Sequence, residues 1–174
     1  MKLNRFVISL ASALLLTVGS ARAQDFLADH LDFAPGTATF SSEELSIDAF
    51  GYSANRNRNG ADQTAWGPGA AANYYFNQYF GVGGETYSDA FNKPYLLNAL
   101  GEARYPIEWL SLSPYAFAGF GRQWTYSAQW LGHFGGGVEW RFAPKTGVFV
   151  DARHVFAGNT SDYTLVRFGI RLVF

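Results

Sequence analysis

Apolar and polar residues alternate with a period of two along most of the chain after residue 43. In the last stretch the apolar side chains occupy alternate positions: Phe168, Ile170, Leu172 and Phe174. Arg167 and Arg171 lie on the opposite face of the same stretch. Successive side chains of a strand point to opposite sides, so this pattern predicts a strand with one apolar and one charged face.

The same alternation predicts eight strands, at 44–55, 64–76, 79–89, 96–107, 113–124, 129–142, 147–156 and 163–174. Short turns near residues 77, 108 and 144 alternate with longer polar loops near residues 58, 92, 126 and 160. Membrane β-barrels combine an even number of such strands with short turns on one side and longer loops on the other. We therefore expect an all-β fold, an eight-stranded antiparallel up-and-down transmembrane β-barrel. A soluble β-sandwich also alternates, but its charges would face water.

Aromatic residues cluster around the predicted turns, as expected for the aromatic girdles of a membrane barrel. They are Tyr74, Tyr75, Phe76, Tyr79 and Phe80 at one turn, Trp140, Phe142 and Phe149 at another, and Trp109 at the third. The fifth strand is ambiguous because both of its faces are largely apolar or small. We interpret Tyr115 and Phe117 as facing outward and Arg122 as facing inward.

The first 23 residues have the three parts of a secretory signal peptide. Lys2 and Arg5 precede an apolar run from residue 6 to 18, and Ala21-Arg22-Ala23 has the form of a cleavage site. The run is too short to cross a bilayer as a helix, which needs about 20 residues. We expect cleavage after Ala23, an N-terminal periplasmic tail or partial plug at 24–43, and the barrel at 44–174.

Composition supports an exported chain made of many short strands. Aromatic residues make up 18% of the chain, there are 19 glycines, and cysteine is absent, so no disulfide holds the protein together. Three of the 13 basic residues lie in the signal segment, so the rest of the chain has ten basic and 14 acidic residues. This balance gives no footprint for nucleic acid. The glycines are expected to make room for large side chains on neighbouring strands.

The polar faces of the predicted strands carry charges of both signs. An eight-stranded barrel has an interior just wide enough to be filled by side chains, so these charges should pair across strands. The predicted interior charge network comprises Asp48, Glu85, Glu102, Arg104, Arg122, Glu139, Arg141, Asp151, Arg153, Arg167 and Arg171. We interpret it as structural, and an ion or proton path is the alternative.

From residue 44 to 174 the chain resembles the small eight-stranded outer membrane barrels of Gram-negative bacteria, the OmpA, OmpX and opacity-protein type. The resemblance is carried by "YYFNQYFGVGGE", "YPIEWLSLSPYAFAGFGRQW", "GGGVEWRFAPKTGVFVDARHVF" and the closing "RFGIRLVF". It implies an outer membrane location, with both chain ends in the periplasm. It also implies that the final strand with its terminal Phe174 is an assembly signal read by the barrel assembly machinery. Periplasmic chaperones and outer membrane lipids are further expected partners, and the barrel is expected to be a monomer.

No catalytic, cofactor-binding or metal-binding residues are predicted. By resemblance, enzymes of this fold that act on lipid A carry a His-x-Ser-Asn pattern. Here His154 is followed by Val155 and Phe156, so the serine two residues on is missing. His30, His133 and His154 lack metal-ligand spacing, and the glycine-rich stretches lack the Lys and Ser or Thr of a phosphate loop. The expected role is therefore structural, in membrane integrity or surface contact. A narrow pore for small solutes is the first alternative, and a lipid A-modifying enzyme is the second.

Overall fold

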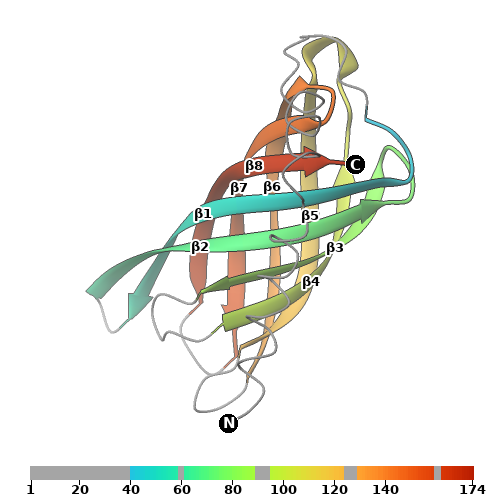
Figure 1. Cartoon of the computed structure of the whole chain (residues 1–174). Coiled ribbons are helices and arrows are strands. Elements are labelled where there is room, and N and C mark those ends of the chain that lie inside the picture. Colours follow the sequence, from blue (N-terminus) through green and yellow to red (C-terminus); the bar gives the residue numbers. More distant parts are fainter. Residues whose placement is uncertain (1–39, 59–60, 89–94, 124–128, 159–161) are drawn as a thin grey trace, which may run out of the picture.

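The protein folds into a closed barrel of eight antiparallel strands in the computed structural model, which describes residues 40–58, 61–88, 95–123, 129–158 and 162–174. Figure 1 shows the strands wrapping around a common axis. The strands are β1 (Glu44–Arg58), β2 (Ala61–Tyr75), β3 (Phe80–Ser88), β4 (Tyr95–Arg104), β5 (Leu112–Gln123), β6 (Gln129–Ala143), β7 (Thr146–Ala157) and β8 (Tyr163–Val173). A short 3₁₀ helix, η1 (Glu108–Leu110), lies between β4 and β5.

The connectivity is a simple meander in which each strand pairs with its neighbours in the chain. The barrel closes where β1 pairs antiparallel with β8, in a register that sets Asp48 opposite Arg171. Closure pairs the first and last strands, which would otherwise be exposed sheet edges. The predicted eight-stranded up-and-down barrel is confirmed. Within the described residues, no helix is long and apolar enough to span a membrane.

The two ends of the barrel differ. The turn end holds the start of β1, the end of β8 and the tight connections β2–β3, β4–β5 and β6–β7; the opposite end is the loop end. In the β2–β3 turn, the Asn77 side-chain oxygen accepts hydrogen bonds from the backbone N–H groups of Tyr79 and Phe80, at 2.8 and 2.9 Å. An Asn side chain that bonds to the backbone ahead of it stabilises such a turn locally.

At the loop end, the β1–β2 hairpin is longer than the sequence predicted. Most of the polar stretch 55–63, which was expected to be a loop, is paired strand on both sides of residues 59–60. Polar side chains bond across the hairpin, Arg56 to Gln63 and Asn57 to Asp62, each at 2.8 Å. Cross-strand polar pairs of this kind stabilise a hairpin that water surrounds. The hairpin projects beyond the other strands at the lower left of Figure 1.

The outer surface of the barrel is apolar. Large hydrophobic side chains are exposed on every strand from β2 to β8, among them Trp66, Phe80, Leu97, Phe120, Trp130, Val150 and Phe168. The outward faces predicted for β1, β3, β4, β6, β7 and β8 are confirmed by this pattern of exposure. In a water-soluble protein such a continuous apolar surface would be unstable, whereas in lipid it is the surface that the fold requires.

The fifth strand and two girdle residues face opposite to the prediction. Tyr115 and Phe117 point inward, with 6% and 4% of their surface exposed, and Arg122 points outward. Tyr75 and Phe149 are also buried inside the barrel and do not belong to an exterior girdle.

Volume explains why these rings are inside. Directly opposite each buried ring, the neighbouring strand carries a glycine: Phe50 and Gly69, Tyr52 and Gly67, Tyr75 and Gly81, Tyr115 and Gly137, Phe117 and Gly135, Phe149 and Gly169. A Cβ atom added at Gly135 would lie 2.8 Å from the Phe117 ring, and one at Gly69 would clash with Phe50. The prediction that glycines make room for large cross-strand neighbours is confirmed.

A buried charge network as the candidate functional site

Ten of the eleven charges predicted to face the interior are buried there. They are Asp48, Glu85, Glu102, Arg104, Glu139, Arg141, Asp151, Arg153, Arg167 and Arg171, each with 6% or less of its surface exposed. The prediction was wrong for Arg122, which lies on the outer surface. It also missed Glu44, the first residue of β1, which is 1% exposed. Glu44 shares the alternation of Ser46 and Asp48, so extending that pattern by one step toward the N-terminus would have found it.

At the turn end, a continuous chain of ion pairs crosses the barrel. Glu44 accepts hydrogen bonds from Arg104 at 2.7 Å and from Arg141 at 2.5 Å. Arg141 also binds Glu139, at 2.6 Å. Glu139 is bound in turn by Arg171, at 2.7 Å. The chain therefore links β1, β4, β6 and β8.

Arg171 ends this chain by binding Asp48 on β1 and Tyr75 on β2. Its Nε and Nη2 donate to the two carboxylate oxygens of Asp48, both at 2.8 Å, in a bidentate pair between directly opposed residues of β8 and β1. Its Nη1 also donates to the Tyr75 hydroxyl at 3.1 Å, and that hydroxyl donates to Glu102. Bidentate arginine pairs add geometric specificity to their charge. We call Glu44, Asp48, Glu102, Arg104, Glu139, Arg141 and Arg171 the turn-end cluster.

A second group of charges, the central cluster, lies toward the middle of the barrel and comprises Glu85, Asp151, Arg153 and Arg167. Glu85 accepts hydrogen bonds from both arginines and, at 2.8 Å, from the Asn98 side chain. Arg167 binds Asp151 with two bonds, at 2.9 and 2.6 Å. The Tyr115 hydroxyl donates to Asp151 at 2.8 Å.

The central cluster balances its own charge, with two carboxylates against two guanidinium groups. Aromatic rings surround the guanidinium of Arg167, whose central carbon lies 4.8 Å from the Phe50 ring centroid and 5.5 Å from that of Phe117. Attraction between a cation and a ring face adds to the ion pairs where water is excluded. The guanidinium of Arg167 is therefore held by carboxylates at its edge and by aromatic rings beside it.

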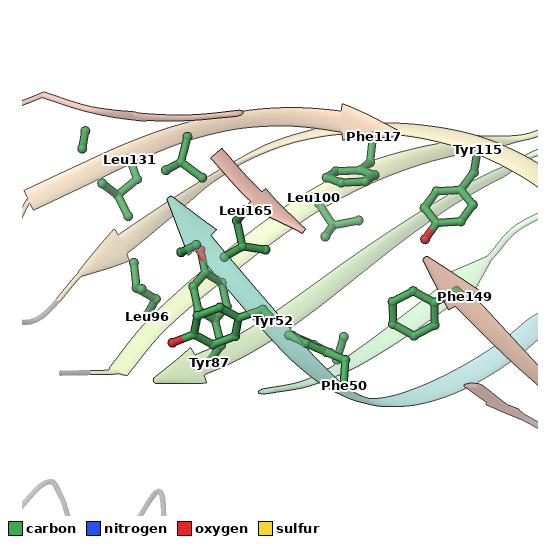
Figure 2. Packing of buried hydrophobic residues seen from close by; sticks show 14 residues of the cluster. Phe50, Tyr52, Tyr87, Leu96, Leu100, Tyr115, Phe117, Leu131, Phe149 and Leu165 are labelled. Carbon is green, nitrogen blue, oxygen red and sulfur yellow. The ribbon is translucent and has the colours of Figure 1, made fainter. Parts of the chain in front are cut away.

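The loop half of the interior is mainly apolar, with a few buried polar side chains such as Asn98, Gln123 and Gln129 among the apolar ones. Leu96, Leu131, Val155 and Leu165 are each 3% exposed or less, and Tyr52 lies beside them. Figure 2 shows Leu96, Leu165 and Tyr52 gathered at one end of the cluster, with Tyr115 and Phe149 at the other. The interior thus changes along its axis from a charge network at the turn end to an apolar core at the loop end.

Phe40 closes the turn end of the charge network. Its ring is 2% exposed and lies under the guanidinium of Arg141, with 4.1 Å between the guanidinium carbon and the ring centroid. The next residue, Ser41, accepts a bond from Arg104 at 3.2 Å through its carbonyl oxygen. The end of the predicted tail segment 24–43 therefore contacts the network. The signal peptide and the rest of that segment lie outside the described residues.

The histidines form no metal site in the part of the chain that the structure describes. No group of three or more His, Cys, Asp or Glu side chains there could hold a metal ion. His133 is buried beside the Phe117 ring, and neither of its ring nitrogens has a hydrogen-bond partner. His154 lies on the outer surface, 3.9 Å from Asp162. His30 is outside the described residues.

Comparison with solved structures identifies the fold. The chain is similar to Neisserial surface protein A, with a TM-score of 0.64, 15% identity, and coverage of 74% of this chain and 96% of that one. It is similar to the N-terminal β-barrel domain of Pseudomonas aeruginosa OprF, with a TM-score of 0.61, 15% identity, and coverage of 77% and 99%. It is also similar to the Yersinia pestis outer membrane protein Ail, with a TM-score of 0.52, 16% identity, and coverage of 76% of this chain and 100% of that one.

These similarities and the apolar exterior define the class of protein: an eight-stranded β-barrel of the outer membrane type. The resemblance inferred from the sequence is confirmed at the level of the fold, and an outer membrane location agrees with it. No family model and no curated protein sequence matches the chain, so the comparison gives no more particular identity.

Proposed function

We propose that the protein is a closed outer membrane barrel that does not conduct and that acts in membrane integrity or surface contact, without catalysis. The observation that carries the proposal is the filling of the interior. Paired charges occupy the turn half, and Leu96, Leu131 and Leu165 occupy the loop half. Ions would have to break buried pairs and then cross an apolar core, and both steps are costly.

The proposed role in surface contact rests on the β1–β2 hairpin. The hairpin projects beyond the other strands and presents the exposed side chains of Asn57, Asp62 and Gln63. Ail has been solved in complex with a heparin analogue, sucrose octasulfate, which is a property of that barrel alone. That precedent supports the idea that a barrel of this fold can bind an external ligand.

Single-channel recording tests the closed state. The refolded wild-type barrel in a planar bilayer is expected to show no steady conductance, because buried ion pairs and tightly packed side chains fill the described interior. The double variant Leu96→Ser with Leu165→Ser is expected to show openings, since it places hydroxyl groups in the apolar core. A steady conductance from the wild-type protein would contradict the proposal and favour the narrow pore.

The C-terminal residue provides a test of assembly. Phe174 lies half exposed on the outer surface, and its N–H donates to the Leu45 carbonyl at 2.9 Å next to the β1–β8 seam. We propose that the alternating residues Phe168, Ile170, Leu172 and Phe174 are read by the barrel assembly machinery after periplasmic chaperones deliver the chain.

Deletion of Phe174, or its replacement by serine, is therefore expected to lower the amount of folded barrel in the outer membrane several-fold. Folded barrel is measured as the heat-modifiable band in membrane fractions. Phe156→Ser, which removes an exposed ring elsewhere on the exterior, serves as the control. Wild-type levels after deletion would show that Phe174 is no assembly signal.

A further inference from the structure

One cation interrupts the apolar exterior. Among the described strand residues from β3 to β8, Arg122 is the only Asp, Glu, Lys or Arg side chain that faces outward. It is the second-last residue of β5, at the loop end. A cation on the lipid-facing surface is costly at the middle of the bilayer but tolerated at its interface. Arg122 therefore lies where lipid headgroups meet the barrel.

The ring of Trp130 lies beside this cation, and the ring of Phe120 lies beside Trp130. The guanidinium carbon of Arg122 lies 5.4 Å from the ring centroid of Trp130, the directly opposed residue on β6. The Trp130 ring is in turn 6.2 Å from the Phe120 ring, and both rings are about three-fifths exposed, at 63% and 60%. No carboxylate of the described residues pairs with Arg122. None of those carboxylates therefore competes with an external anion for its charge.

An open slot lies beside the cation on the same surface. Gly132 on β6 faces outward between two phenylalanines, Phe120 on β5 and Phe156 on β7, which are its direct partners in the sheet. A Cβ atom added at Gly132 would meet only the edge of Phe156, at 3.9 Å, so the space above it is open. The stacked rings of Phe134 and Phe156, 5.7 Å apart, border the slot on the side toward the turn end.

We propose that this surface binds a phosphorylated lipid, with its phosphate on Arg122 and an acyl chain in the slot over Gly132. A guanidinium fork matches the geometry of a phosphate, and the aromatic slot suits a hydrocarbon chain and not a polar peptide. The inference rests on the proposed orientation in the outer membrane, where the loop end meets the outer leaflet. The phosphorylated lipid of that leaflet is lipid A, which is the occupant that we infer.

Native mass spectrometry of the refolded barrel in detergent tests the site. Lipid A is titrated against the wild-type protein, and lipid A without its phosphates is titrated in parallel. The wild-type barrel is expected to bind the phosphorylated form about tenfold more tightly, the usual worth of a charge-assisted contact. Arg122→Gln is expected to abolish that preference. Arg56→Gln makes the same change on the projecting hairpin and is expected to leave it intact.

A second variant tests the slot without altering the charge. Gly132→Leu fills the space between Phe120 and Phe156 and is expected to weaken binding of both forms of the lipid. Equal affinity of the wild-type barrel for the two lipids, or an unchanged preference in Arg122→Gln, would overturn the proposal. Displacement of lipid A by an equal concentration of inorganic phosphate would show an anion site only and would also overturn it. The closed state of the barrel is judged by conductance, so the two ideas fail separately.

Discussion

Replacement of Glu85 by alanine is expected to destabilise the barrel by about 3–5 kcal/mol, the cost of leaving a buried charge without its partner. Glu85 accepts hydrogen bonds from Arg153 on β7 and Arg167 on β8. Arg167 keeps Asp151 after the change, but Arg153 pairs with no other carboxylate of the described residues. The free energy of unfolding is measured by urea titration of the barrel in lipid vesicles.

Two further variants separate the loss of a pair from the loss of a side chain. Glu139→Ala is expected to cost less, because Arg141 keeps Glu44 and Arg171 keeps Asp48. The double change Glu85→Ala with Arg153→Leu is expected to recover much of the loss, since it removes the stranded charge and leaves an apolar side chain beside Phe117. Equal stability of Glu85→Ala and the wild-type barrel would mean that water, and not Glu85, compensates Arg153.

The faces of most strands could be predicted because size and polarity change together along them. On β7, for example, Val148 and Val150 alternate with Asp151 and Arg153 in register with the pleat. A shift by one residue would send every charge into lipid, so only one register is stable. The same argument held for β8, where Phe168 and Ile170 alternate with Arg167 and Arg171.

Hydropathy did not predict the inward face of β5, because both of its faces are apolar. Side-chain volume determines that face instead. On β5, outward Ala116 and Ala118 alternate with inward Tyr115 and Phe117, the reverse of the prediction. The signal was present in the sequence, since β6 carries glycines at 135 and 137. It could be used only with the strand register, because that register sets Phe117 opposite Gly135.

Ion pairs between strands that are not neighbours could not be predicted from the sequence. Alternation predicts that Glu85 and Arg153 both face inward, but β3 and β7 are not neighbours in the barrel. Their contact depends on strand tilt and stagger, which set the height of each side chain along the axis. The direct pair of Asp151 and Arg167 follows from the order of β7 and β8, whereas the link from Glu85 to Arg153 needs the closed three-dimensional form.

A charged residue placed on the lipid-facing surface is expected to cause the second large loss of stability. Val150 faces outward on β7, is 47% exposed, and is flanked by Val138 on β6 and Phe168 on β8. Val150→Arg is expected to destabilise the refolded barrel by about 2–4 kcal/mol, the cost of an arginine near the middle of the bilayer. The loss is measured by urea unfolding in lipid vesicles.

The matched control for Val150→Arg is Ala61→Arg, which adds the same side chain to an exposed position of the β1–β2 hairpin. Water surrounds the hairpin, so this variant is expected to stay within about 0.5 kcal/mol of wild type, as surface substitutions usually do. Arg122 shows that the exterior accepts a guanidinium at the loop end, next to Trp130. The difference in the free energy of unfolding between the two variants therefore reports how deep Val150 lies in the membrane. Equal stability of the two would mean that Val150 does not face lipid, and would refute the assignment of the apolar surface as the membrane-facing one.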